Sequence, residues 1–132
     1  MKPFSTLLIA FLILGGCCAG TQQNAQREMR DDQIYDAEAL VLAGKRICVD
    51  MRHNGTFKTL AESAKCSNPK IIAAYERVHF PYMDLVKHYT DRRLEILEKE
   101  DNKEISEARS VKELNELLPY LKAEAHVRDE GL

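Results

Sequence analysis

The first twenty residues constrain the fold most, because their pattern is that of a leader and not of a folded domain. Lys2 precedes an apolar run from Phe4 to Leu14, and small residues follow this run as far as Gly20. A basic start, a short apolar core and small residues are the three parts of a secretory signal peptide. A membrane-spanning helix needs about 20 apolar residues, so this run of 11 predicts export without a transmembrane anchor. We therefore expect one small domain, built from the residues that follow.

The end of the apolar run contains a cysteine in a specific context. Leu14-Gly15-Gly16-Cys17 resembles the lipobox of bacterial lipoproteins, a class in which the cysteine is acylated and becomes the first residue of the mature chain. The resemblance covers only the leader. It implies a signal peptide over residues 1–16 and a lipid anchor at Cys17, which would hold the protein at the periplasmic face of a bacterial membrane. The alternative is a plain signal peptide that is cleaved near Gly20 and releases a soluble periplasmic protein.

The composition of the remaining chain predicts a spacer followed by a globular domain. Residues 17–31 are predicted to form a flexible spacer, because 21–26 are rich in Gln and Asn and lack apolar periodicity. Residues 32–132 are predicted to fold, since 45% apolar and 30% charged residues overall are typical of globular proteins. Lys and Arg number 19 against 21 Asp and Glu. Without a basic surplus, nucleic acid is not an expected partner.

Two cysteines, Cys48 and Cys66, lie within the predicted domain. An even pair in an exported chain is most simply a disulfide, and a loop of this size predicts a stabilisation of about 3 kcal/mol. The alternative is a metal or redox pair, but such pairs need closer spacing or nearby His ligands. We therefore predict a structural disulfide between these two residues.

The segment between the cysteines is compatible with either a hairpin or two helices. Asn54-Gly55 is a typical hairpin turn, and apolar residues alternate over 47–51 before it. A regular hairpin, however, would not place Cys48 and Cys66 within the Cα separation of about 7 Å that a disulfide requires. The pattern at 59–62 also matches a capping box, which starts helices. Two short helices that turn near Asn54 are therefore the preferred interpretation.

The other apolar residues recur at helical spacing and are separated by helix breakers. Together with the disulfide, they predict an all-α bundle of about five helices. The predicted elements before the corner are a helix over 32–43 that Gly44 ends and a helix capped by Asn68 with Pro69 in its first turn. A corner at 79–81 follows, then a helix over 82–100, then a final helix from a capping box at 110–113 that Pro119 kinks or interrupts.

Arg93 is the first candidate for a functional residue, because it lies in the middle of the apolar arc of the helix over 82–100. One interpretation makes it a binding residue for a carboxylate or phosphate ligand. The other makes it an internal partner of a carboxylate, or a side chain whose stem covers the core while its head reaches water. The second interpretation is preferred, since a lone Arg on the apolar arc, without a glycine-rich loop or a second cation on that arc, is a weak anion site.

Two other groups of residues are weaker candidates for a functional site. Asp84 and His88 stand four residues apart and are a weak metal candidate, although an exposed pair on one helix face is the simpler interpretation. The cluster at 80–83 is either an exposed aromatic docking patch or, preferably, packed inside its corner. No catalytic or cofactor-binding motif is found in the sequence, so neither enzyme activity nor a cofactor is predicted. We expect a non-enzymatic envelope lipoprotein that binds another envelope protein; the alternative is a carrier of a small ligand or metal in a cleft between helices.

Overall fold

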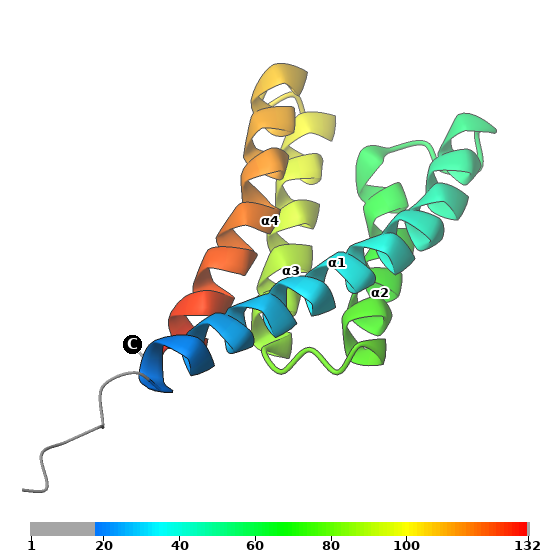
Figure 1. Ribbon diagram of the computed structural model, residues 1–132. Coiled ribbons are helices and arrows are strands. Elements are labelled where there is room, and N and C mark those ends of the chain that lie inside the picture. The colour runs from blue at the N-terminus through cyan, green and yellow to red at the C-terminus, as the bar shows by residue number, and fades with distance from the viewer. Residues whose placement is uncertain (1–17, 132) are drawn as a thin grey trace, which may run out of the picture.

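The protein is a helical bundle, and the part that the structure describes contains no strand (Figure 1). The computed structural model describes residues 18–131, so the predicted signal peptide over 1–16 and the predicted lipidation site at Cys17 lie outside the described residues. The four helices are α1 (Cys18–His53), α2 (Leu60–Arg77), α3 (Met83–Asp101) and α4 (Glu107–Asp129). The all-α class is confirmed, but the described residues form four helices and not about five.

Helix α1 is much longer than the helix predicted over 32–43. The predicted spacer over 17–31 is helical from Cys18 onwards, because tertiary contacts that the apolar pattern does not reveal hold it. Arg30 forms an ion pair with Asp129 at the end of α4. This contact and the ion pair between Arg27 and Glu130 join α1, at residues 27–30, to the end of α4.

Gly44 does not end a helix, as the sequence predicted, but lies within α1. A Cβ atom at Gly44 would lie 3.1 Å from the Cβ of Lys70 on α2, which is closer than ordinary van der Waals contact. The glycine therefore allows α1 and α2 to pack closely, and this packing compensates for the low helix propensity of glycine.

The connection from α1 to α2 follows the predicted helical arrangement. The chain turns over 54–58, and Asn54 Oδ1 accepts a hydrogen bond of 3.0 Å from the backbone N–H of Thr56. Thr59 caps α2 and forms the predicted capping box with Glu62. The predicted disulfide between Cys48 and Cys66 is confirmed, with a Cα–Cα distance of 5.9 Å, and it joins α1 to α2 across this turn.

The predicted helix start at Asn68 and Pro69 is wrong, because α2 continues through both residues. Asn68 does not cap a helix, since its side chain donates a hydrogen bond of 2.9 Å to the backbone carbonyl of Thr90 on α3. Pro69 is exposed, so its ring does not disturb the packing of α2 against its neighbours. The contacts on both sides of α2 compensate for the single backbone hydrogen bond that proline removes.

The corner predicted at 79–81 is confirmed, since α2 ends at Arg77 and α3 begins at Met83. Phe80 is buried in this corner, where its ring lies edge-on to Tyr75 at 5.2 Å and to Tyr82 at 5.9 Å. The aromatic cluster at 80–83 therefore packs largely inside the corner, which is the interpretation that the sequence analysis preferred over an exposed docking patch.

Helix α4 begins earlier than predicted. Ser106 is its N-cap and accepts a hydrogen bond of 3.2 Å from the backbone N–H of Arg109. The predicted cap, Ser110, is fully buried inside the first turns of α4 and does not cap the helix. The helix is continuous through Pro119, where the sequence predicted a kink or a restart.

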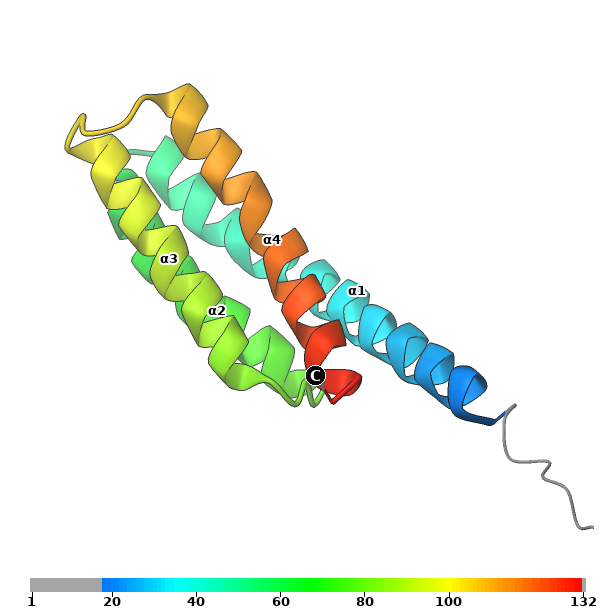
Figure 2. The ribbon, with the colours of Figure 1, turned by 90° about the vertical axis from the view of Figure 1, so that its left-hand side faces the viewer.

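Each helix packs on the next one in the chain, and α4 also contacts the first half of α1. Figure 1 shows that α1 and α4 meet near the start of α1 and then diverge, while Figure 2 shows the start of α1 extending past the end of α4. No helix among residues 18–131 is long and apolar enough to cross a membrane. The core lies between all four helices and contains Ile34, Val41, Ile71, Tyr75, Phe80, Val86, Tyr89 and Leu121.

Candidate functional site

The divergence of α1 and α4 leaves a cleft of about 490 Å³ that involves three helices. We call it the Arg93 cleft. Helix α1 contributes Lys45, and α3 contributes Tyr89 and Arg93. The remaining lining residues come from α4 and are mostly apolar: Leu114, Asn115, Leu117, Leu118 and Pro119. The cleft thus combines an apolar wall with two cationic side chains.

Arg93 is half-buried, and within residues 18–131 its hydrogen-bond partners are neutral groups. Its Nη1 atom donates to Ser67 Oγ and to Asn68 Oδ1 on α2, both at 2.8 Å. No carboxylate of the described chain forms an ion pair with Arg93, so the internal ion pair that the sequence suggested is not present. Burial lowers the pKa of Arg93, because the charged guanidinium is partly removed from water. Two of its three nitrogen atoms, Nε and Nη2, keep their donors available among the described residues.

Lys45 supplies the second cation, which sequence reasoning missed. Its Nζ atom donates a hydrogen bond of 3.5 Å to the hydroxyl of Tyr89 and lies 5.9 Å from the centroid of the same ring. Burial lowers the pKa of Lys45, and the positive charge of Arg93 lowers it further, while Glu38 acts in the opposite direction. Glu38 itself accepts a hydrogen bond of 2.9 Å from the Tyr75 hydroxyl and forms no ion pair with Lys45.

The electrostatics of the Arg93 cleft favour a bound anion. Two cations share one partly desolvated site, where burial lowers the pKa of both and Arg93 lowers that of Lys45 further, and neither has a paired carboxylate in the part of the chain described. Tyr89 is buried at the same place, and burial is the main reason why its pKa is raised, so its hydroxyl stays neutral at physiological pH. An anionic group in this cleft would accept charge-assisted hydrogen bonds from Lys45 and Arg93, and its negative charge would offset the repulsion between these two side chains.

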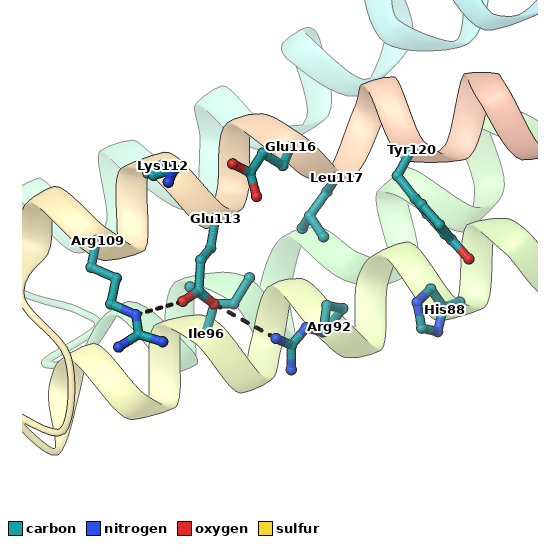
Figure 3. A pocket seen from close by; sticks show the side chains of 9 residues that line it. All are labelled: His88, Arg92, Ile96, Arg109, Lys112, Glu113, Glu116, Leu117 and Tyr120. Carbon is teal, nitrogen blue, oxygen red and sulfur yellow. Dashed lines mark hydrogen bonds and ion pairs between the residues drawn. The ribbon is translucent and has the colours of Figure 1, made fainter.

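A second groove of about 630 Å³ runs between α3 and α4 (Figure 3). Its two arginines already have a carboxylate partner, since Glu113 accepts a hydrogen bond of 2.8 Å from Arg109 and lies 3.6 Å from Arg92. Arg109 and Arg92 accordingly lower the pKa of Glu113. This groove is larger than the Arg93 cleft, but its paired charges offer less to an anionic ligand.

Asp84 and His88, the weak metal candidate, contact different residues. Both carboxylate oxygens of Asp84 accept hydrogen bonds from Arg128, at 2.7 and 2.8 Å. The His88 ring instead lies 5.8 Å from the ring of Tyr120 in the groove between α3 and α4. Among residues 18–131, no group of three or more His, Cys, Asp or Glu side chains is placed to hold a metal ion.

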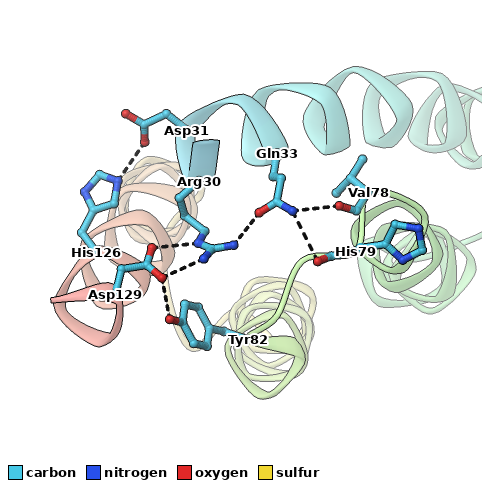
Figure 4. Close-up of polar contacts among 8 residues, drawn as sticks. All are labelled: Arg30, Asp31, Gln33, Val78, His79, Tyr82, His126 and Asp129. Atoms are coloured by element: carbon cyan, nitrogen blue, oxygen red, sulfur yellow. Dashed lines mark hydrogen bonds and ion pairs between the residues drawn. The ribbon is translucent and has the colours of Figure 1, made fainter. Parts of the chain in front are cut away.

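A polar network joins α1 to the last turns of α4 (Figure 4). Arg30 donates two hydrogen bonds, of 2.8 and 2.7 Å, to the carboxylate of Asp129, which also accepts a bond of 2.6 Å from the Tyr82 hydroxyl. The Arg30 bonds keep the pKa of Asp129 below its usual range. Gln33 accepts from Arg30 and donates to the backbone carbonyl of Val78 at 3.0 Å, which ties the α2–α3 corner to the same network.

Sequence reasoning missed Arg30 because it placed this residue in a spacer. The signal that would have found it is the spacing of Arg30 from Ile34, Ala37 and Val41, which continues the buried face of α1 toward its start. No family model matches the chain, and no curated protein or solved structure matches it at a significant level.

Proposed function

We propose that the protein is a non-enzymatic lipoprotein of the bacterial cell envelope that binds a small organic anion in the Arg93 cleft. The observation that supports binding is the pair of half-buried cations, Lys45 and Arg93, which share one cleft without an ion-paired carboxylate in the described chain. Structural cations at such burial normally have a carboxylate partner. A carboxylate or phosphate from a ligand would complete this site.

The lining of the cleft narrows the ligand class. The α4 wall contributes Leu114, Leu117 and Leu118, which suit an apolar body next to the charged group. The volume of about 490 Å³ lies within the range that small-molecule sites occupy. The planar guanidinium of Arg93 has two nitrogen atoms available for a forked hydrogen bond to two oxygens. The proposed ligand is therefore a small molecule with one carboxylate or phosphate group on an apolar or aromatic body.

Calorimetric titration with benzoate and phenyl phosphate tests the proposal, with benzyl alcohol as the neutral probe of the same shape. We expect the two anions to bind and the alcohol to bind at least about tenfold more weakly, because it forms no charge-assisted hydrogen bond. Arg93→Gln and Lys45→Gln should each weaken anion binding by about tenfold or more. Arg92→Gln is the matched control, since Arg92 neighbours Arg93 on α3 but faces the other groove and pairs with Glu95 and Glu113.

The pH dependence gives an independent check on Lys45. A bound anion favours the charged amine, so anion affinity should fall as the pH rises through the lowered pKa of Lys45. The same dependence should be absent in Lys45→Gln. Equal binding of benzoate and benzyl alcohol, or equal anion binding by wild type and Arg93→Gln, would refute the proposed ligand class.

The envelope location is supported by the lipobox-like leader and by the Cys48–Cys66 disulfide, since disulfides persist mainly in oxidising compartments. Intact-mass measurement of the protein from the membrane fraction tests the anchor. We expect a mature chain that begins at Cys17 and carries acyl chains, and we expect Cys17→Ser to lose them. A wild-type protein without acyl chains would refute lipid anchoring at this residue.

Binding of a protein partner is the second candidate function. The aromatic cluster at 80–83 does not supply the docking surface, because Phe80 is buried and Tyr82 and Met83 are half-buried. A different observation favours a protein partner, namely the exposed apolar side chains on the outer face of α1.

A further inference from the structure

The outer face of α1 carries apolar side chains that no other helix covers. Tyr35, Leu42 and Val49 are 77%, 69% and 42% exposed, and they follow one another at intervals of seven residues. Residues seven apart on an α-helix differ in direction by only about 20°, so these three side chains form one stripe. The stripe is about 21 Å long at the usual helical rise. We call it the α1 stripe.

The α1 stripe has the spacing of a helix-pairing seam. Ala39 and Arg46 fall between its three apolar residues, which gives alternating intervals of four and three residues, as in coiled coils. Ala39 and the neighbouring Ala43 are exposed and small, so a second helix could approach the backbone of α1 closely there. The opposite face of α1, with Ala37, Val41 and Cys48, is the one buried within the bundle.

Charges beside the stripe are mostly divided by sign along the helix. Asp32 and Asp36 lie toward its start, whereas Arg46 and Arg52 lie toward its end together with one acidic residue, Asp50. All five are exposed, and none forms an ion pair with another described residue. Elsewhere on the same helix, Arg30 and Asp31 do pair with α4.

We infer that the α1 stripe binds the α1 stripe of a second copy of this chain, with the two helices antiparallel. In that orientation the acidic half of each face lies beside the basic half of the other, and Leu42 lies near the two-fold axis. A parallel pair would instead place Asp32 beside Asp32 and Arg46 beside Arg46, which like-charge repulsion opposes. A two-fold interface is self-complementary, as this division of charge requires. Figure 1 shows α1 crossing the front of the other helices, so its outer face is open to a second molecule.

Co-purification of two differently tagged full-length copies from detergent-solubilised membranes tests the inference. We expect each wild-type copy to recover the other, and light scattering to give the mass of a protein dimer. Asp32→Lys with Asp36→Lys in both copies should reduce recovery by about tenfold or more, because the exposed charges of this face become mostly basic. Arg46→Glu with Arg52→Glu in both copies should do the same, because the whole face becomes acidic.

Mixing the two charge variants separates a specific interface from a loss of folding. A copy with Asp32→Lys and Asp36→Lys should recover a copy with Arg46→Glu and Arg52→Glu, because opposite charges face each other again. Leu42→Asp should prevent recovery, whereas Val111→Asp, which changes an exposed apolar residue on α4, should not. Failure of wild-type copies to recover each other would overturn the inference. Unchanged recovery between two copies of the same charge variant would overturn the antiparallel arrangement. In a parallel pair, like charges already face each other in the wild type, so reversing the sign of one set would leave the repulsion unchanged.

Discussion

Removal of one partner of the Arg30–Asp129 ion pair should destabilise the protein more than removal of one partner of any other ion pair among the described residues. The side chains of Arg30 and Asp129 are only 7% and 6% exposed, so the pair is almost completely removed from water. Asp129→Ala would leave the buried guanidinium without a counter-charge and the Tyr82 hydroxyl without its acceptor. Removal of one partner from a buried ion pair typically costs about 3–5 kcal/mol. Small domains have a total stability of only about 5–15 kcal/mol, so the variant should be strongly destabilised.

Urea unfolding followed by circular dichroism measures this loss, and hydrogen exchange locates it. We expect Asp129→Ala to lower the free energy of unfolding by about 3 kcal/mol or more. Amide protection should fall first in the last turns of α4 and around Arg30 in α1, where the pair joins the two helices. Replacing both partners, as in Arg30→Leu with Asp129→Leu, should cost less than Asp129→Ala alone, because it leaves no unpaired buried charge.

Asp84→Ala is the matched control for Asp129→Ala. Asp84 forms a two-bonded pair with Arg128 near the same end of α4, with distances of 2.7 and 2.8 Å, but both residues are exposed. Exposed pairs contribute little, because water already solvates both charges. If Asp84→Ala and Asp129→Ala destabilise the protein equally, or if Asp129→Ala leaves α4 as protected as in wild type, burial does not determine the strength of this pair.

The same pair predicts the direction of the pH dependence. Arg30 keeps the pKa of Asp129 below its usual range in the folded protein. A carboxyl with a lowered folded pKa stabilises the protein above its unfolded pKa of about 3.9, and this stabilisation is lost as the pH falls through the folded value. As the pH falls, the wild type should therefore lose a part of its free energy of unfolding that the variant with Arg30→Leu and Asp129→Leu does not lose. Identical acid unfolding of the two proteins would contradict this assignment.

Three further predictions concern the disulfide and two buried serines. The variant with both Cys48→Ala and Cys66→Ala should lose about 3 kcal/mol in urea unfolding, because the disulfide closes a loop with a sequence separation of 18, and reduction of wild type should reproduce that loss. Ser110→Ala should leave stability unchanged or raise it by about 1 kcal/mol, because the buried Ser110 hydroxyl has no hydrogen-bond partner in the described chain. Ser67→Ala, by contrast, should destabilise the protein, since Ser67 accepts a hydrogen bond from the buried side of Arg93. A clear loss of stability in Ser110→Ala would show that its hydroxyl forms a bond that contributes to the fold.

Local sequence patterns predicted the features that depend on neighbouring residues. The capping box at Thr59 and Glu62, the corner at 79–81 and the helix near 82–100 are confirmed, because capping bonds, proline geometry and apolar periodicity act within a few residues. The pairing of Cys48 with Cys66 also followed, since the described domain contains these two cysteines at a spacing that two helices can bridge.

The same local rules failed where distant residues decide the conformation. Gly44 and Pro69 are helix breakers by propensity, yet both lie inside helices because close packing between α1, α2 and α3 outweighs their local cost. The predicted spacer became helical because Arg30 finds Asp129 almost a hundred residues later in the chain.

The sequence alone determined the helical class, the positions of the turns between the helices, and the position of Arg93 within the apolar arc of its helix. Each of these follows from the spacing of residues along the chain. Only the tertiary structure placed Lys45 of α1 beside Arg93 of α3 and left both without a carboxylate among the described residues. The physical reason is that a charge acts through space and desolvation depends on what surrounds it. Neither the partner nor the surroundings can be read from one helix at a time.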